Sequence, residues 1–213
     1  MSRSGDETAA TASPGSWEGV FIDPTAVVEV GAEIGPGTRV WHFCHVMGGA
    51  RIGREVVLGQ NCFVADGVVV GDGCRIQNNV SLFGGVVLED HVFCGPSAVF
   101  TNVSTPRAGV DRHESFEPTL VRRGASLGAN CTIVCGHTIG EYALIGSGAV
   151  VTADVVAHRL MLGVPARPAG WVCRCGEVLR GLERGDRGGR VSCSRCGEMY
   201  QLAPDGALER VEL

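Results

Sequence analysis

Four cysteines near the C-terminus have the types and spacing of a metal site. Cys173 and Cys175 form one close pair, Cys193 and Cys196 form a second, and a glycine follows each pair. Two close pairs of thiolates are the ligand set that holds tetrahedral zinc in structural sites. A tail as short as residues 171–213 would hardly fold without such a staple. We therefore predict a zinc-ribbon-like tail with structural zinc. Metal-free reduced thiols and disulfides are the alternatives, because the first pair has the less usual spacing C-x-C.

A second set of chemical groups recurs at intervals of eighteen residues. His42, Gln60 and Asn78 follow one another at that interval, and Asn61 and Asn79 stand directly after two of them. Amides both donate and accept hydrogen bonds, and a neutral imidazole can accept a proton. We expect these side chains to form a ligand-binding wall that could orient an amine. The alternative is that the asparagines only turn corners, because the left-handed backbone conformation suits them.

The elements that would position this wall follow from a period of six. Starting at Ile22, nearly every sixth residue is aliphatic as far as Phe100, and the period resumes from Val121 to Val151. An α-helix cannot use a period of six, whereas short strands joined by tight turns can. Three hexads make one coil, and coils stack at about 4.8 Å. The sequence therefore predicts an all-β solenoid of six to seven coils in which residues eighteen apart lie one above the other.

Other segments fall outside this period. Residues 1–20 are expected to be a flexible N-terminus, and residues 21–156 the solenoid. Residues 101–120 break the phase and form a polar insertion loop too long for a plain connector. Arg107 within it could reach a cleft or a neighbouring subunit, so the loop is either a lid over substrate or coenzyme or a surface excursion. Residues 157–170 are expected to connect the solenoid to the tail.

The composition excludes several functions. The net charge of −5 argues against a nucleic-acid partner. The chain has no lysine, which excludes a Schiff-base lysine and a Walker-type phosphate loop. Neither a signal peptide nor an apolar stretch of membrane-spanning length is present, so we expect a cytoplasmic protein without membrane insertion. The cysteines within the hexads are expected to be small buried thiols: Cys44, Cys62, Cys74 and Cys131.

The hexad repeat resembles that of the hexapeptide-repeat acyltransferases, which fold as left-handed parallel β-helices and assemble as trimers. The handedness and the homotrimer come from this resemblance, since general crossover chirality favours the right hand. The stretch Gly163-Val164-Pro165-Ala166-Arg167 resembles the end of the solenoid in the acetyl-CoA-dependent members. The resemblance implies that Arg167 meets the nucleotide end of acetyl-CoA. It also implies that the small residues Ala129 and Ser147, spaced by eighteen with Pro165, leave room for the pantetheine arm.

Further motifs resemble one branch of that family, the UDP-2-acetamido-3-amino-2,3-dideoxy-glucuronate N-acetyltransferases. They are Val40-Trp41-His42-Phe43, Ile76-Gln77-Asn78-Asn79-Val80-Ser81, Leu88 to Pro96, Phe100-Thr101-Asn102 and Gly128 to Gly136. The resemblance implies acetyl transfer from acetyl-CoA to the 3-amino group of a UDP-linked 2-acetamido-3-amino-uronic acid, for bacterial surface polysaccharide (O-antigen). It makes Asn79 the first catalytic candidate, Asn78 the second and His42 a possible base.

Residues near these candidates are expected to bind the nucleotide-linked amino sugar: Gln60, Asn61, Ser81 and Arg107. The expected mechanism is direct transfer without a covalent enzyme intermediate, because a neutral amine is already a good nucleophile. Two other functions stay open. One is N-acetylation of another nucleotide-linked amino sugar, such as a dTDP-3-amino-deoxyhexose. The other is a non-catalytic trimeric solenoid that acts as an interaction module.

Overall fold

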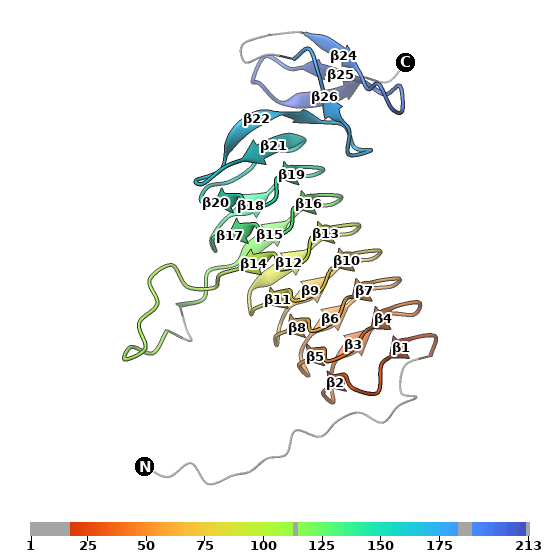
Figure 1. The fold of residues 1–213 in the computed structure, drawn as a ribbon, viewed down its shortest axis with the longest axis vertical. Coiled ribbons are helices and arrows are strands. Elements are labelled where there is room, and N and C mark those ends of the chain that lie inside the picture. Colours follow the sequence, from red (N-terminus) through yellow and green to blue (C-terminus); the bar gives the residue numbers. More distant parts are fainter. Residues whose placement is uncertain (1–17, 113–114, 183–188, 212–213) are drawn as a thin grey trace.

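The hexad repeat folds as a left-handed parallel β-helix of about eight turns, which confirms the predicted fold class. The computed structural model describes residues 18–112, 115–182 and 189–211. Two-residue strands alternate with tight turns, and the coils stack into a long triangular prism (Figure 1). In the part of the chain that the structure describes, no helix is long and apolar enough to cross a membrane.

Each side of the prism is a stack of parallel strands. The first side consists of β1 (Phe21–Ile22), β4 (Arg39–Val40), β7 (Val57–Leu58), β10 (Arg75–Ile76), β13 (Phe93–Cys94), β16 (Ser126–Leu127), β19 (Leu144–Ile145) and β21 (Arg159–Leu162). The second side consists of β2 (Val27–Val28), β5 (His45–Val46), β8 (Phe63–Val64), β11 (Ser81–Leu82), β14 (Val99–Phe100), β17 (Thr132–Ile133) and β20 (Val150–Val151). The third side consists of β3 (Glu33–Ile34), β6 (Arg51–Ile52), β9 (Val69–Val70), β12 (Val86–Leu88), β15 (Thr119–Val121) and β18 (Thr138–Ile139).

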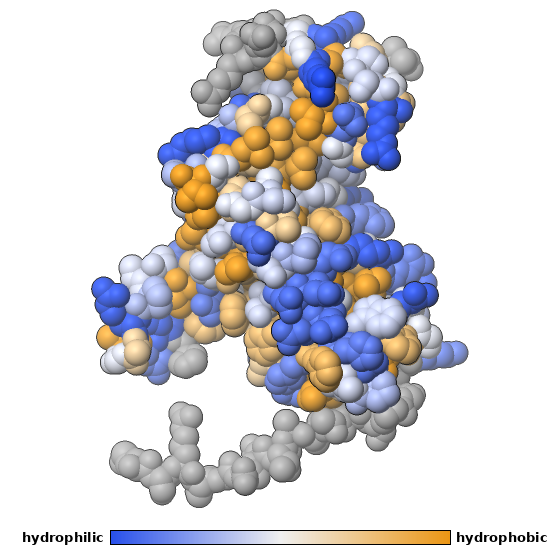
Figure 2. All heavy atoms as spheres, viewed as in Figure 1, coloured by the Kyte–Doolittle hydropathy of each residue, from blue (hydrophilic) through white to orange (hydrophobic). Residues whose placement is uncertain are grey.

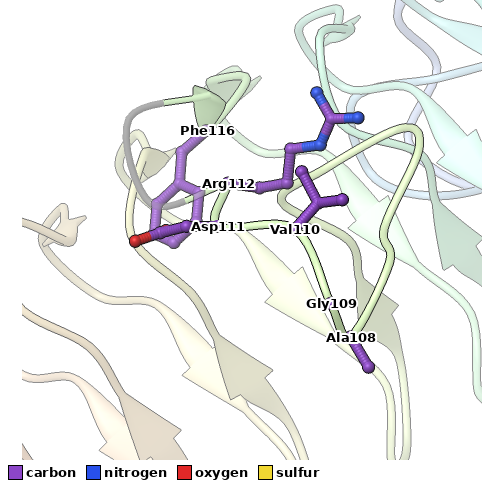
Figure 3. A pocket seen from close by; sticks show the side chains of 6 residues that line it. All are labelled: Ala108, Gly109, Val110, Asp111, Arg112 and Phe116. Atoms are coloured by element: carbon purple, nitrogen blue, oxygen red, sulfur yellow. The ribbon is translucent and has the colours of Figure 1, made fainter.

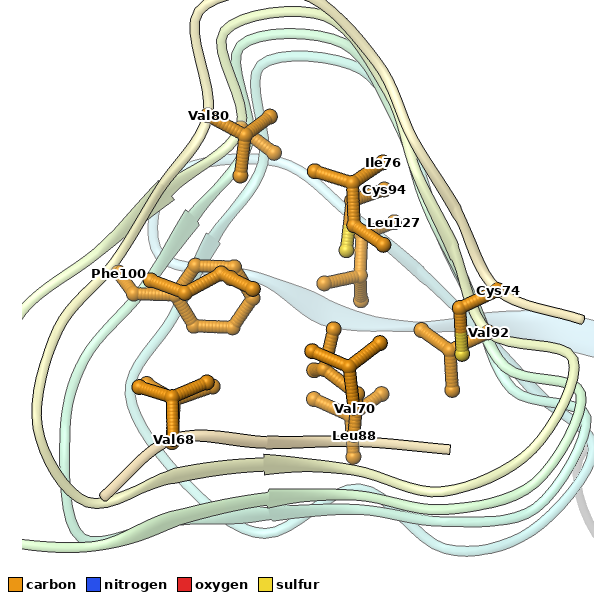
Figure 4. Packing of buried hydrophobic residues seen from close by; sticks show 14 of the residues in the cluster. Val68, Val70, Cys74, Ile76, Val80, Leu88, Val92, Cys94, Phe100 and Leu127 are labelled. Atoms are coloured by element: carbon orange, nitrogen blue, oxygen red, sulfur yellow. The ribbon is translucent and has the colours of Figure 1, made fainter. Parts of the chain in front are cut away.

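The second residue of each short strand points inward, and a small or branched residue from each turn fills the corners (Figure 4). Ile76 and Val80, for example, are fully buried. The four cysteines expected to be core thiols are all buried. Burial raises the pKa of Cys74 and of Cys131 to about 11, so both remain neutral thiols at physiological pH. They serve as packing groups.

The solenoid extends beyond the predicted end at residue 156. Strand β21 pairs in parallel with β19, and Leu160 lies beside Leu144, sixteen residues earlier rather than eighteen. The last coil is therefore short, and Leu162 lies over Gly146. The predicted column of Ala129, Ser147 and Pro165 is consequently wrong at its last member, because Pro165 comes after the coil has closed.

The insertion loop leaves the prism after β14 and returns at β15, so it runs from 101 to 118, two residues shorter than predicted. Thr119 already pairs with Val86 in the third side. The loop projects away from the prism in Figure 1. It encloses an open hollow of about 430 Å³, and Figure 3 shows Arg112 extended away from Phe116 there.

The C-terminal lobe caps the last coil (Figure 1). Strand β22 (Arg167–Val172) turns back antiparallel to β21, so the predicted connector 157–170 largely consists of strands. Strand β23 (Val178–Leu179) pairs with β22. A separate sheet follows, made of β24 (Arg190–Ser192), β25 (Met199–Leu202) and β26 (Leu208–Val211). The lobe has its own small core around Trp171 and Tyr200. The face seen in Figure 2 is hydrophobic where this lobe meets the last coils.

The predicted flexible N-terminus lies outside the described residues as far as residue 17.

Candidate functional site

Most of the predicted site residues lie along one edge of the prism, where the chain turns from the first side to the second. We call it the site edge. Its turns stack through backbone hydrogen bonds between successive coils, from Asn61 N to His42 O (2.8 Å) at one end to Gly148 N to Ala129 O (2.9 Å) at the other. From the N-terminal end, the turn residues in order are His42, Gln60, Asn78, Pro96, Ala129 and Ser147. The sequence predicted the ligand-binding wall and the coenzyme residues as two separate groups. In the structure they lie on one line along the same edge.

The asparagines of the wall combine both roles that the sequence suggested. Asn61 and Asn79 have left-handed backbone angles, φ 60° and 62°, so they do turn the corner. Their side chains also bond to each other, Asn61 Nδ2 donating to Asn79 Oδ1 at 3.0 Å. Asn78 Oδ1 accepts from the Gln60 backbone N–H at 2.9 Å. The amide nitrogens of Asn78 and Asn79 find no hydrogen-bond partner among the described residues and are exposed, so they remain available as donors.

His42 has a buried partner that the sequence analysis missed. Asp23 is 6% exposed, and its Oδ1 lies 2.9 Å from His42 Nδ1. The same oxygen accepts from the backbone N–H and the hydroxyl of Thr25 at 2.9 and 2.6 Å. These hydrogen bonds from Thr25, with a smaller contribution from His42, lower the pKa of Asp23. The carboxylate therefore fixes the imidazole through Nδ1, and Nε2 has no partner in the described part of the chain. Asp-Pro-Thr signals a turn, but nothing in the sequence signals the pairing with His42.

Two predicted acceptor-binding residues lie away from the site edge. Ser81 is on the outward face of β11, within the second side. Arg107 belongs to the insertion loop, which leaves the prism at the next edge, between the second and third sides (Figure 1). A single chain thus does not bring Arg107 to Asn78.

The predicted coenzyme residues continue the site edge towards the C-terminal lobe. Ser147 is exposed and Ala129 half-buried. A Cβ on Gly128 would lie 2.5 Å from Ser147 N, so the backbones of adjacent turns approach closely here. Arg167 is exposed and pairs with Leu162 at the start of β22, which places it just beyond the last turn of the edge. A long, thin ligand could lie against this edge with its anionic end at Arg167.

The four tail cysteines form a cluster whose donor set fits zinc. Their sulfur atoms all lie within 4.8 Å of one another. Cys173 follows the end of β22 directly, and its Sγ lies 3.4 Å from that of Cys196, while Cys175 and Cys193 lie 3.6 Å apart. Four convergent sulfurs match tetrahedral thiolate ligation, so the C-x-C spacing does not prevent the arrangement.

Two family models match the chain. The model described as "Bacterial transferase hexapeptide (six repeats)" matches residues 31–66 and 49–84, and "Hexapeptide repeat of succinyl-transferase" matches residues 123–153. Among solved structures, a hexapeptide-repeat acetyltransferase of Vibrio cholerae complexed with acetyl coenzyme A superimposes with a TM-score of 0.49. It is 25% identical and covers 55% of this chain and 68% of its own.

One curated relative extends the similarity over nearly the whole chain. The dTDP-3-amino-3,6-dideoxy-alpha-D-galactopyranose 3-N-acetyltransferase of Aneurinibacillus thermoaerophilus is 40% identical over 201 residues, which are 92% of this chain and 97% of the relative. The bifunctional protein GlmU of Polaromonas naphthalenivorans is 27% identical, but the match spans only 29% of that protein. The stacked hexads and the first of these relatives show that the chain is an enzyme of the hexapeptide-repeat acyltransferase family.

Proposed function

We propose that this enzyme transfers the acetyl group of acetyl-CoA to the 3-amino group of a nucleotide-linked amino sugar. The observation that carries the proposal is the site edge, where unpartnered amide donors lie in line with small turn residues and Arg167. The product would feed bacterial surface polysaccharide. This function is preferred to a non-catalytic solenoid, because a purely structural edge has no need of exposed amide donors at one end and an exposed arginine at the other.

The acceptor we favour is a dTDP-3-amino-3,6-dideoxyhexose. The relative that is 40% identical is named for such a substrate and is covered over 97% of its length. The wall itself also contains amides and one imidazole but no arginine, whereas a UDP-linked uronic acid carries a carboxylate that needs a cationic partner. The test compares kcat/KM for the dTDP-linked sugar with that for the UDP-linked uronic acid; a preference for the uronic acid would reverse our choice.

The length of the coenzyme supports the placement of the reaction at the asparagines. The pantetheine arm has twelve bonds between diphosphate and sulfur, equivalent to about four extended residues or roughly 13 Å. Coils stack at about 4.8 Å, so an arm that starts beside Ser147 ends three coils away, near Asn78. The thioester therefore meets the acceptor amine at the level of Asn78 and Asn79.

The proposed chemistry is one direct displacement. The neutral amine attacks the thioester carbonyl, the amide Nδ2 groups of Asn78 and Asn79 donate to the oxyanion, and the C–S bond then breaks. The proton of the amine passes to the leaving thiolate and gives the free thiol of coenzyme A. No side chain needs to become acylated, so orientation and oxyanion stabilisation supply the catalysis.

Blocking the coenzyme groove gives a specific prediction. Ser147→Trp should raise KM for acetyl-CoA at least about tenfold and leave KM for the acceptor nearly unchanged, because the indole occupies the path of the arm. Glu141→Trp is the matched control: Glu141 is exposed at the equivalent turn position of the same coil, one edge away. Equal effects of both substitutions in steady-state kinetics would contradict the placement of the coenzyme.

A homotrimer is the proposed assembly. A single prism leaves the site edge open on both sides, and its insertion loop departs from a different edge. Exposed apolar residues on the flat sides would be covered by neighbouring copies, including Phe93 at 38%, Val99 at 47% and Val27 at 41% exposure. Light scattering at micromolar concentration should give three times the mass of the chain. A fully active monomer would rule the assembly out.

We also propose that Cys173, Cys175, Cys193 and Cys196 bind one structural zinc ion. Their convergence in the lobe supports this, and the lobe has only a small apolar core of its own.

A further inference from the structure

Aromatic side chains gather at the N-terminal end of the site edge. The rings of Phe21 and Trp41 lie 5.3 Å apart, those of Trp41 and His42 6.2 Å, and those of His42 and Phe43 6.0 Å. Phe21, Trp41 and Phe43 are 44%, 37% and 60% exposed. This aromatic end of the edge is thus a continuous outward-facing surface of rings next to the wall of amides.

Phe43 occupies the left-handed corner position of its turn. Its φ is 59°, a left-handed angle that costs a bulky residue about 1–2 kcal/mol. The two coils above place Asn61 and Asn79 at this same turn position, and asparagine tolerates the angle well. Packing of the Phe43 ring in the core does not offset this cost, since the ring is mostly exposed. The angle itself belongs to the corner, because Glu55, His91 and Tyr142 adopt it at turns of another edge. What distinguishes Phe43 is a large apolar ring that is open to solvent beside the wall.

Two polar residues lie beside these rings: Arg39 is the strand partner of Phe21, and His42 is held by a buried carboxylate. The buried Asp23 carboxylate holds His42 through Nδ1, and the half-exposed imidazole has no partner at Nε2 among the described residues, so Nε2 is open to a ligand. Arg39, three residues earlier, is exposed, and its guanidinium has no hydrogen bond or ion pair to any residue that the structure describes. A cation and an oriented imidazole beside aromatic rings form the combination that binds a phosphate and a base.

The acceptor is long enough to reach from the asparagines to this end of the edge. His42 lies two coils from Asn78, about 10 Å. In a sugar nucleotide about thirteen bonds through the pyranose, the diphosphate and the ribose separate the amine on C3 from the nucleobase, a path equivalent to about four extended residues or at most roughly 14 Å. An acceptor with its amine at Asn78 and Asn79 therefore extends to the aromatic end.

We propose that the aromatic end of the site edge binds the nucleoside diphosphate of the acceptor. The pyrimidine stacks on Trp41 and Phe43, and Arg39 and His42 bind the diphosphate. This assignment rests on the proposed function for the identity of the ligand. It makes His42 a nucleotide-binding residue rather than the base, and Asp23 its positioning residue.

Calorimetric titration of the full-length protein with dTDP alone tests the assignment. Phe43→Asn and Trp41→Leu should each weaken dTDP binding about tenfold, the effect of losing one stacked ring. The melting temperature of Phe43→Asn should be equal to or above that of the unchanged protein, because asparagine suits φ 59°. Val178→Ala is the control, since Val178 is an apolar residue with 38% exposure that lies in the C-terminal lobe, away from this end of the edge, and it should not alter dTDP binding.

Unchanged dTDP affinity in both Phe43→Asn and Trp41→Leu would overturn the assignment. The assignment would also be overturned if these variants lost the oligomer in light scattering while their dTDP affinity per chain stayed unchanged. This surface would then be an interface between copies. The proposed function fails separately: an unchanged protein that acetylates no amino sugar refutes the activity, while weaker dTDP binding by the variants still supports the nucleotide site. If both variants still acetylate the acceptor and their KM for it equals that of the unchanged protein, only the nucleotide site is refuted.

Discussion

Asn79→Gly is expected to lower kcat for acetyl transfer by roughly 10²-fold and to leave KM for acetyl-CoA nearly unchanged. The substitution removes an amide donor whose nitrogen has no partner within the described chain, and loss of one oxyanion donor has an effect of this size. Glycine accepts the left-handed angle of φ 62°, so the turn itself is preserved. Steady-state kinetics with the acceptor and acetyl-CoA varied in turn provides the measurement.

Glu55→Gly is the matched control for this substitution. Glu55 also has a left-handed angle, φ 54°, but it lies on the edge between the third and first sides. It should therefore leave kcat unchanged. His42→Ala should mainly raise KM for the acceptor. If His42→Ala instead lowered kcat by about 10² to 10⁴ while Asn79→Gly had no effect, His42 would be the general base and our ranking would be wrong.

Cys193→Ser is expected to abolish stoichiometric zinc binding and to unfold the C-terminal lobe. The free energy of zinc binding in such sites is of order 10 kcal/mol, more than a core this small supplies. The effect should reach the coenzyme, because β22 ends one residue before Cys173 and begins at Arg167. KM for acetyl-CoA should therefore rise, whereas KM for the acceptor should change little. Metal analysis, limited proteolysis and kinetics on the same preparation check the three parts.

Two variants separate the roles of metal and arginine. Arg167→Ala should raise KM for acetyl-CoA with zinc content unchanged, because the guanidinium is exposed and lies outside the cysteine cluster. Cys74→Ala should keep its zinc, since Cys74 is buried in the solenoid. Protein purified without chelator that contains no stoichiometric zinc would eliminate the metal site.

The solenoid could be predicted because its period allows one kind of structure. An aliphatic residue at every sixth position fills the interior of a triangular coil, and the eighteen-residue register follows, as between Val57 and Arg75. The last coil could not be predicted, because the hexad pattern fades after Val151 and β21 adopts a sixteen-residue spacing through its pairing with β19. Its consequence, the displacement of Pro165 from the coenzyme column, was equally hidden.

The candidate site was only partly accessible from the sequence. The eighteen-residue spacing predicts that His42, Gln60 and Asn78 lie together. It does not predict that Ala129 lies on the same edge, because the insertion loop breaks the spacing. The strand register shows it, because Phe93 pairs with Ser126 across the loop. The role of Asp23 could not be predicted, because its burial and its contact with His42 depend on the neighbouring coil. The two interpretations of Asn79, corner residue and functional amide, are compatible. Its backbone makes the turn, while its side chain forms a hydrogen bond and keeps its amide nitrogen available as a donor.

The most direct test of the account is a reaction of the purified protein with acetyl-CoA and a dTDP-3-amino-3,6-dideoxyhexose. Release of coenzyme A thiol and the mass of the sugar nucleotide are followed together. We predict one thiol released for each acetyl group gained by the sugar, and no burst of thiol when the acceptor is omitted. A burst without acceptor would contradict direct transfer, and no acetylation of this or the UDP-linked amino sugar would contradict the proposed function itself.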